Sequence, residues 1–279
     1  MKNNEDETGH GGERRSGGGS PLALIAGPCV LETEAKALEI ARYLKTLAGA
    51  LEIGLIFKAS YDKANRTSLG GFRGPGLKEG LEILAAVKRE CDVPVLTDVH
   101  RFEEIGPAAA VADVLQVPAF LCRQTDFVME VARRAGVINL KKGQFLAPSD
   151  CAPMVEKARA AGNERIILTE RGTSFGYHNL VADFRALPIL RSLGYPVVFD
   201  ATHSVQLPGG SGNASGGDRD MVPYLCRAAV AAGVDGLFLE VYPDPSQARC
   251  DGPNSLALDT LPGLLKTLIA IDRLVRETF

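Results

Sequence analysis

Apolar runs of strand length alternate with amphipathic segments of helix length along almost the whole chain of 279 residues. The apolar runs are rich in Val, Ile and Leu without polar alternation, which is typical of strands buried on both faces. The predicted strands are residues 22–28, 54–59, 93–98, 114–119, 137–141, 165–169, 196–200 and 236–240. The predicted helices include residues 33–48, 76–90, 124–135, 149–161, 217–232 and 258–277.

This order of elements predicts an α/β protein with a parallel sheet, because repeated βα units connect by right-handed crossovers. Eight such units can close into a single (β/α)8 TIM barrel, which takes about 250 residues. An open, doubly wound sheet is the alternative. The first 20 residues contain no Leu, Ile, Val or Phe, so they cannot bury enough surface to offset the entropy of ordering. We therefore predict a disordered tail at 1–20 and one catalytic barrel domain at 21–279.

Composition excludes several other classes of protein. The net charge of −3 gives no reason to expect nucleic acid or an anionic membrane as a partner. No stretch approaches the roughly 18 apolar residues of a membrane span, and the N-terminus lacks the apolar segment of a secretory signal. The six cysteines show no CxxC spacing, which favours reduced thiols over a disulfide framework. We expect a cytoplasmic protein.

Polar residues stand at or just beyond the carboxyl ends of the predicted strands. Active sites of such barrels are built at that face. Solvated loop charges would account for any one of these residues, but poorly for a polar group at every strand end. The residues are Cys29, Lys58, Asp98, His100, Gln116, Lys141, Lys142, Glu170, Arg171, His203 and Glu240.

Cations are concentrated at this predicted face of an otherwise acidic protein. The segment KASYDKANRTS, residues 58–68, contributes Lys58, Lys63 and Arg66 beside hydroxyl side chains. Arg suits bidentate contact with phosphate, and Lys acts as a point charge. The pattern therefore predicts a strongly anionic ligand, with ordinary surface basicity as the alternative. Further cations on later segments are Arg123, Lys141, Lys142 and Arg171.

A second group of residues has the chemistry of metal ligands. Cys29, His203, Glu240 and Asp251 supply a thiol, an imidazole and two carboxylates, which suit a first-row divalent metal. Spacing alone does not establish the site, because the four residues lie on different segments and no local motif connects them. Taken alone, Cys29 would more often be a small buried thiol.

Several longer motifs together resemble the 3-deoxy-D-manno-octulosonate 8-phosphate synthases, from about residue 21 to the C-terminus. They include AGPCVLE (26–32), FKASYDKANRTS (57–68), LTDVH (96–100), QVPAFLCRQTD (116–126), NLKKGQFLAP (139–148), FDATHSVQLPGG (199–210) and CDGPNSL (250–256). The related 3-deoxy-arabino-heptulosonate 7-phosphate synthases, which use erythrose 4-phosphate, typically carry a KPRTSP-like segment. This chain reads KANRTS there, which favours the five-carbon sugar phosphate. A non-catalytic sugar-phosphate sensor would lack catalytic positions, and none is missing.

The resemblance implies condensation of phosphoenolpyruvate with D-arabinose 5-phosphate and water, giving the eight-carbon sugar acid phosphate and inorganic phosphate. This product leads to the core sugar of lipopolysaccharide. The family is usually a homotetramer. By motif, phosphoenolpyruvate would be held by Lys58, Lys63, Lys141 and Arg171 with Gln116 and Ala119 nearby. The sugar phosphate would contact Asn65, Arg66 and Thr67 at its phosphate and Asp98 at its hydroxyls, and Arg123 would add to the phosphate sites, reaching a neighbouring subunit.

The same resemblance bears on the metal. Members with Cys in the first strand use a divalent metal (Fe, Zn, Mn or Co), whereas members with Asn need none. Cys29 therefore implies a metal held by Cys29, His203, Glu240 and Asp251, of which His203 and Asp251 could also move protons. Two features complicate this implication, because CDGPNS resembles the metal-free branch and Tyr242 replaces a His of the E-x-H-P turn. Neither change removes a ligand.

Overall fold

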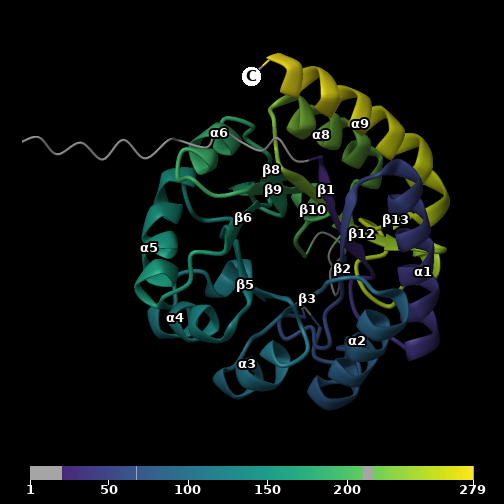
Figure 1. Cartoon of the computed structure of the whole chain (residues 1–279), viewed down its shortest axis with the longest axis vertical. Coiled ribbons are helices and arrows are strands. Elements are labelled where there is room, and N and C mark those ends of the chain that lie inside the picture. Colours follow the sequence, from purple (N-terminus) through teal and green to yellow (C-terminus); the bar gives the residue numbers. More distant parts are fainter. Residues whose placement is uncertain (1–20, 67, 210–215, 279) are drawn as a thin grey trace, which may run out of the picture.

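A computed structural model describes residues 21–66, 68–209 and 216–278; the predicted tail at 1–20 and Thr67 lie outside the described residues. Eight parallel strands form a closed barrel in the order β1-β2-β3-β4-β5-β6-β9-β12, and β12 pairs back with β1 (Figure 1). These strands are β1 (Ala23–Gly27), β2 (Gly54–Lys58), β3 (Val95–Asp98), β4 (Val114–Val117), β5 (Val137–Lys141), β6 (Ile166–Glu170), β9 (Val197–Asp200) and β12 (Gly236–Tyr242). The prediction of a TIM barrel is confirmed.

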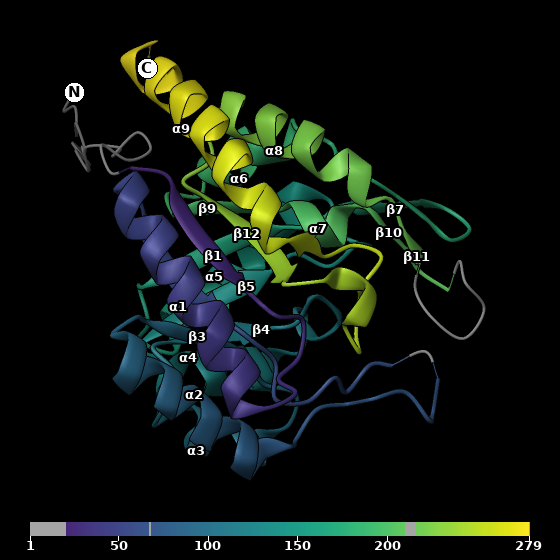
Figure 2. The same cartoon turned by 90° about the vertical axis from the view of Figure 1, so that its right-hand side faces the viewer.

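Helices surround the barrel (Figures 1 and 2). They are α1 (Glu34–Leu51), α2 (Leu77–Cys91), α3 (Phe102–Ala109), α4 (Thr125–Arg134), α5 (Ala152–Ala160), α6 (Ala186–Arg191), α8 (Val222–Ala231) and α9 (Leu261–Thr278), together with the short α7 (Ala201–Ser204). The predicted helices are confirmed with shifted ends. Helices α3 and α6 were not predicted, because both are short and contain a proline, Pro107 or Pro188, which weakens the periodic apolar signal.

Minor elements extend from the same end of the barrel. The hairpin of β7 (Thr173–Gly176) and β8 (Asn179–Val181) follows β6, and β10 (Gln206–Leu207) pairs with β11 (Gly216–Gly217). Strand β13 (Leu256–Ala257) pairs with β12. Figure 2 shows the segment between β2 and α2 extending beyond the barrel on the same side as β10 and β11. In the part of the chain that the structure describes, every helix is too short or too polar to cross a membrane.

The barrel interior is filled by one apolar side chain from each strand. Because side chains alternate along a strand, the next residue that points inward is two positions further on. At that next level the inward-facing residues are mostly polar. A polar layer therefore lies directly on the apolar layer, toward the carboxyl ends of the strands. This apolar layer consists of Ile25, Leu96, Val114, Val198 and Phe238, packed with Ile56, Val137 and Ile167.

Gly27, at the end of β1, permits close approach of β2. A Cβ at this position would overlap the backbone carbonyl oxygen of Lys58. We expect Gly27→Ala to lower the free energy of unfolding by about 3 kcal/mol, at the upper end of typical overpacking costs, and to reduce activity by displacing Lys58. Urea unfolding measures the first effect. Gly54→Ala is the matched control, since its nearest neighbour would be the Ala23 Cβ at 4.0 Å; equal stability of the two variants would contradict this account.

Candidate active site

A layer of polar side chains lies two residues beyond the apolar layer on most strands. Thr169 donates to Asn139 at 2.7 Å, and Asn139 donates to Gln116 at 3.0 Å. This chain of hydrogen bonds fixes the amide of Gln116 within the barrel. The polar layer consists of Lys58, Asp98, Gln116, Asn139, Thr169, Asp200 and Glu240, all buried.

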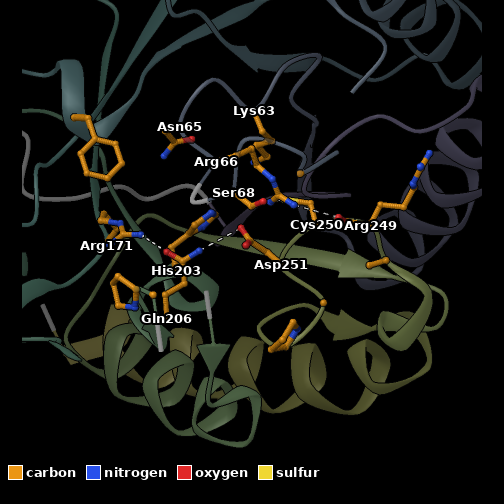
Figure 3. A pocket seen from close by; sticks show the side chains of 17 residues that line it. Lys63, Asn65, Arg66, Ser68, Arg171, His203, Gln206, Arg249, Cys250 and Asp251 are labelled. Carbon is orange, nitrogen blue, oxygen red and sulfur yellow. Dashed lines mark hydrogen bonds between the residues drawn. The ribbon is translucent and has the colours of Figure 1, made fainter. Parts of the chain in front are cut away.

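A cavity of about 460 Å³ opens above this layer (Figure 3). Its walls come from the segments that follow β2, β4, β6 and β12, and from α7 with the segment after it. Among the lining residues, the cations Lys63, Arg66, Arg171 and Arg249 outnumber the single carboxylate, Asp251. The lining residues used below are Lys63, Asn65, Arg66, Arg171, His203, Gln206, Arg249, Cys250 and Asp251.

Two lysines meet the carboxylate of Glu240 at the cavity floor. Lys58 Nζ lies 3.3 Å from Glu240 Oε1 and Lys63 Nζ lies 3.6 Å from the same atom. Burial raises the pKa of Glu240, but the charges of His203, Lys63 and Lys58 outweigh it and leave the pKa at about 2. Burial lowers the pKa of Lys63, yet neighbouring Cys29 and Glu240 hold it well above its ordinary value. The Lys63–Glu240 pair is therefore charged at neutral pH.

Asp200 connects Lys141 to His203. Its Oδ2 lies 2.5 Å from Lys141 Nζ and 2.7 Å from His203 Nδ1, and its side chain accepts from the His203 backbone N–H at the start of α7. Burial lowers the pKa of Lys141, an effect that Asp200 opposes and Arg171 reinforces. The arrangement orients the imidazole so that Nε2 lies 3.4 Å from Glu240 Oε1. Asp200 thus positions two predicted functional residues at once.

Arg171 forms part of the cavity wall. It donates from Nη2 to Gln206 at 2.7 Å, and Gln206 donates to Asp251 at 3.2 Å (Figure 3). The other terminal nitrogen, Nη1, is buried and has no hydrogen-bond partner among the described residues. An unsatisfied buried donor of this kind costs free energy, so it is suited to an anionic ligand that enters the cavity.

Asp98 and His100 form a charged pair beside the lysines. His100 Nε2 lies 3.0 Å from Asp98 Oδ2, and the Ser60 hydroxyl donates to Asp98 Oδ1 at 2.5 Å. Burial raises the pKa of Asp98, but the hydrogen bond from His100 outweighs it and the pKa lies well below its usual value. The pKa of His100 is raised, since Asp98 outweighs the effect of burial. The pair is largely buried beside the lysines and lies outside the lining of the cavity.

The predicted metal ligands form two groups that share Asp251. Ligand atoms of His203, Glu240 and Asp251 all lie within 4.8 Å of one another, and so do those of Cys29, Cys250 and Asp251. Glu240 Oε2 is buried without a hydrogen-bond partner among the described residues. A buried, unpartnered carboxylate oxygen beside imidazole and thiol groups fits a divalent cation.

The predicted site residues divide between the cavity lining and the buried layer next to it. Lys63, Asn65, Arg66, Arg171, His203 and Asp251 line the cavity. The predicted residues buried outside its lining are Cys29, Lys58, Asp98, Gln116, Ala119, Lys141 and Glu240. Arg123 is exposed on the single chain and does not line the cavity.

Sequence reasoning did not single out Asp200, Asn139, Gln206 or Cys250 as site residues. The first two could have been found by counting two residues on from an inward apolar residue, Val198 or Val137. No local signal places Gln206 or Cys250 in the site, because each reaches it through a loop whose path depends on the closed barrel.

Comparison with known proteins agrees with this geometry. The sequence profile of the DAHP synthetase I family matches residues 3–277. A protein of Geobacter metallireducens named 2-dehydro-3-deoxyphosphooctonate aldolase is 63% identical over 265 residues, covering 95% of this chain and 97% of that protein. Proteins of the same name from Geobacter sulfurreducens and Geobacter sp. strain M21 are 60% and 62% identical, covering 95% and 94% of this chain and 97% and 96% of theirs. The chain belongs to the DAHP synthetase I family, and within it to the 2-dehydro-3-deoxyphosphooctonate aldolases.

Proposed function

We propose that this chain condenses phosphoenolpyruvate with D-arabinose 5-phosphate and water, giving 3-deoxy-D-manno-octulosonate 8-phosphate and inorganic phosphate. The observation that carries this function is 60–63% identity, over about 95% of the chain, to proteins named for that enzyme. These relatives favour this reaction over the seven-carbon synthase that uses erythrose 4-phosphate. The cation-rich cavity at the barrel mouth is suited to two phosphorylated substrates.

The phosphoenolpyruvate site is proposed at the cavity floor. Lys58, Lys63 and Lys141 approach it from β2, the segment after β2, and β5, and Arg171 turns its unpartnered Nη1 inward. Their charges offset the repulsion between two anionic substrates, which lets the substrates lie within reacting distance. Positioning of this kind can lower a barrier by ~7–11 kcal/mol. Gln116 and Ala119 would support this site from β4 and the segment after it.

The sugar phosphate site is proposed at the outer part of the cavity. Asn65 and Arg66 line that part and would bind the phosphate, with Thr67 beside them in sequence. Asp98 would then accept hydrogen bonds from the sugar hydroxyls. Arg123, exposed on one chain, would reach the phosphate site of a neighbouring subunit in the homotetramer that we propose, and we place this enzyme in the cytoplasm.

In the proposed reaction, C3 of phosphoenolpyruvate attacks the aldehyde carbon of the sugar phosphate. A C–C bond forms, the C=O π bond of the aldehyde breaks, and the aldehyde oxygen takes up a proton to become a hydroxyl. Positive charge develops at C2, water adds there, and phosphate leaves from the resulting hemiketal. Lys58, Lys141 and Arg171 hold the phosphate and carboxylate throughout, and His203 or Asp251 would accept the proton of the attacking water.

A divalent metal (Fe, Zn, Mn or Co) would be held by Cys29, His203, Glu240 and Asp251. When bound, such an ion can polarise the aldehyde or lower the pKa of a water molecule. Asp200 would orient His203 for this purpose, because a carboxylate on the second ring nitrogen fixes the tautomer of a histidine ligand.

A substrate-pair assay tests the function. Purified protein is incubated with phosphoenolpyruvate and either D-arabinose 5-phosphate or erythrose 4-phosphate, and phosphate release and product mass are measured. We expect kcat/KM to be at least about 10³-fold higher with the five-carbon sugar, since hydrogen-bonding sites can discriminate by 10⁴–10⁵. Preference for erythrose 4-phosphate would instead identify a seven-carbon synthase. If no phosphate were released with either sugar, both proposed activities would be contradicted.

A further inference from the structure

Cys250 lies beside the proposed metal ligands, but the proposed reaction gives it no role. Its sulfur is 2.8 Å from the Cys29 sulfur, and the Cys29 sulfur is 3.4 Å from Asp251 Oδ2. Both cysteines are buried and reduced, and the sulfur separation is longer than the ~2.05 Å of a disulfide. Ligand atoms of Cys29, Cys250 and Asp251 thus form a compact group with two sulfurs.

The backbone presents Cys250 and Asp251 to the same place. Asp251 adopts a left-handed conformation with φ of 48°, which residues other than glycine seldom adopt. This turn follows Cys250 directly, and both side chains meet Cys29 from one short segment. Figure 3 shows Cys250 and Asp251 side by side at the cavity wall. Cys250 and Asp251 therefore reach Cys29 from adjacent positions of one loop.

A cation lies beside this sulfur pair without competing for a metal. Arg66 Nη1 lies 2.9 Å from the Cys250 sulfur, and Arg66 Nη2 donates to the Arg249 carbonyl at 3.4 Å. A guanidinium has no acceptor to offer a metal ion, so Arg66 is not itself a ligand. The Cys250 sulfur is thus held by an arginine on one side and faces Cys29 on the other.

We infer that Cys250 is a further ligand of the divalent metal, so that the centre contains two thiolates rather than one. This inference rests on the proposed metal site and deepens it. Each thiol gives up its proton to solvent when the metal binds. Two soft sulfur ligands beside imidazole and carboxylate groups favour zinc or a similar thiophilic ion over magnesium.

Cobalt(II) binding distinguishes one thiolate from two. Cobalt is added to the metal-free protein, and equilibrium dialysis and the near-ultraviolet sulfur-to-cobalt charge-transfer absorption are recorded. We expect Cys250→Ser and Cys29→Ser each to lose about half of this absorption per bound cobalt and the double variant to lose all of it. Cobalt affinity should fall at least about tenfold in each single variant, a loss typical even of residues that only support a ligand.

Cys91→Ser is the matched control, because Cys91 is a buried thiol at the end of α2 outside the site; its absorption and affinity should match wild type. Full absorption in Cys250→Ser with complete loss in Cys29→Ser would overturn the inference while leaving the metal site intact. Failure of the wild-type protein to bind cobalt would overturn the metal site and the inference together.

X-ray absorption spectroscopy of the zinc-loaded wild-type protein gives an answer that needs no variant. Two sulfur neighbours around zinc are expected. One sulfur neighbour would overturn the assignment of Cys250, even if Cys250→Ser does not fold.

Discussion

Replacing Lys141 with alanine is expected to reduce kcat/KM for phosphoenolpyruvate by about 10²–10³-fold, the usual loss when one preorganised electrostatic contact is removed. Lys141 is buried at the carboxyl end of β5, 2.5 Å from Asp200 and 4.3 Å from the centre of the Phe238 ring. Water cannot readily replace a charge in such a position. Steady-state kinetics and direct binding of phosphoenolpyruvate measure the loss.

The same substitution should also destabilise the fold, because it removes a partner from the buried carboxylate of Asp200. Breaking a buried ion pair costs about 3–5 kcal/mol, although His203 remains beside Asp200. The double variant Lys141→Met with Asp200→Asn removes both charges, so it should recover part of the stability but none of the activity. The double variant therefore separates the loss of substrate binding from the loss of stability.

Lys45→Ala is the control for net charge, since Lys45 is exposed on α1. It should leave both kinetics and stability unchanged. Full affinity of Lys141→Ala for phosphoenolpyruvate would contradict the proposed substrate site.

Removal of the metal is expected to abolish turnover, and addition of Mn, Fe, Co or Zn should restore it. An ion that supplies several kcal/mol of transition-state stabilisation accounts for at least about 10²-fold in rate. The experiment treats the purified protein with a chelator, verifies the metal content, and measures activity before and after each metal is added. Unchanged turnover in protein shown to be metal-free would rule out a catalytic metal.

Cys29→Asn provides a second arm of the same experiment. The CDGPNS segment resembles that of synthases that need no metal, and those synthases carry Asn in the first strand. We therefore expect this variant to keep partial activity that a chelator does not change. A variant without any activity would argue that Cys29 is indispensable in this sequence background.

The barrel strands were predictable because their signal is local. Runs such as 93–98 and 137–141 begin with apolar, mostly β-branched residues and end in polar ones. Parallel strands in a closed barrel end at one face, so Lys58, Lys141 and Arg171 could be assigned to a common site before any contact was known. Helices α3 and α6 escaped prediction because six to eight residues with an internal proline carry too little periodic signal.

The contacts within the site were less predictable. The inward position of Asp200 could be predicted, because it lies two residues after Val198 on the same strand. Its contacts with Lys141 and His203 could not be predicted, because those residues lie on other segments. For Arg123 the motif implies a phosphate contact, whereas in the single chain this residue is exposed and does not line the cavity.

By itself, the sequence determined eight strands, their shared carboxyl-terminal face, an excess of cations there and the family of enzymes. Only the tertiary structure decided which of these side chains touch. Cys29 and Cys250 are separated by 221 positions, and they meet because β12 pairs with β1 and closes the barrel. Strand patterns arise from neighbouring residues, whereas such a contact depends on closure of the whole sheet, which no local segment encodes.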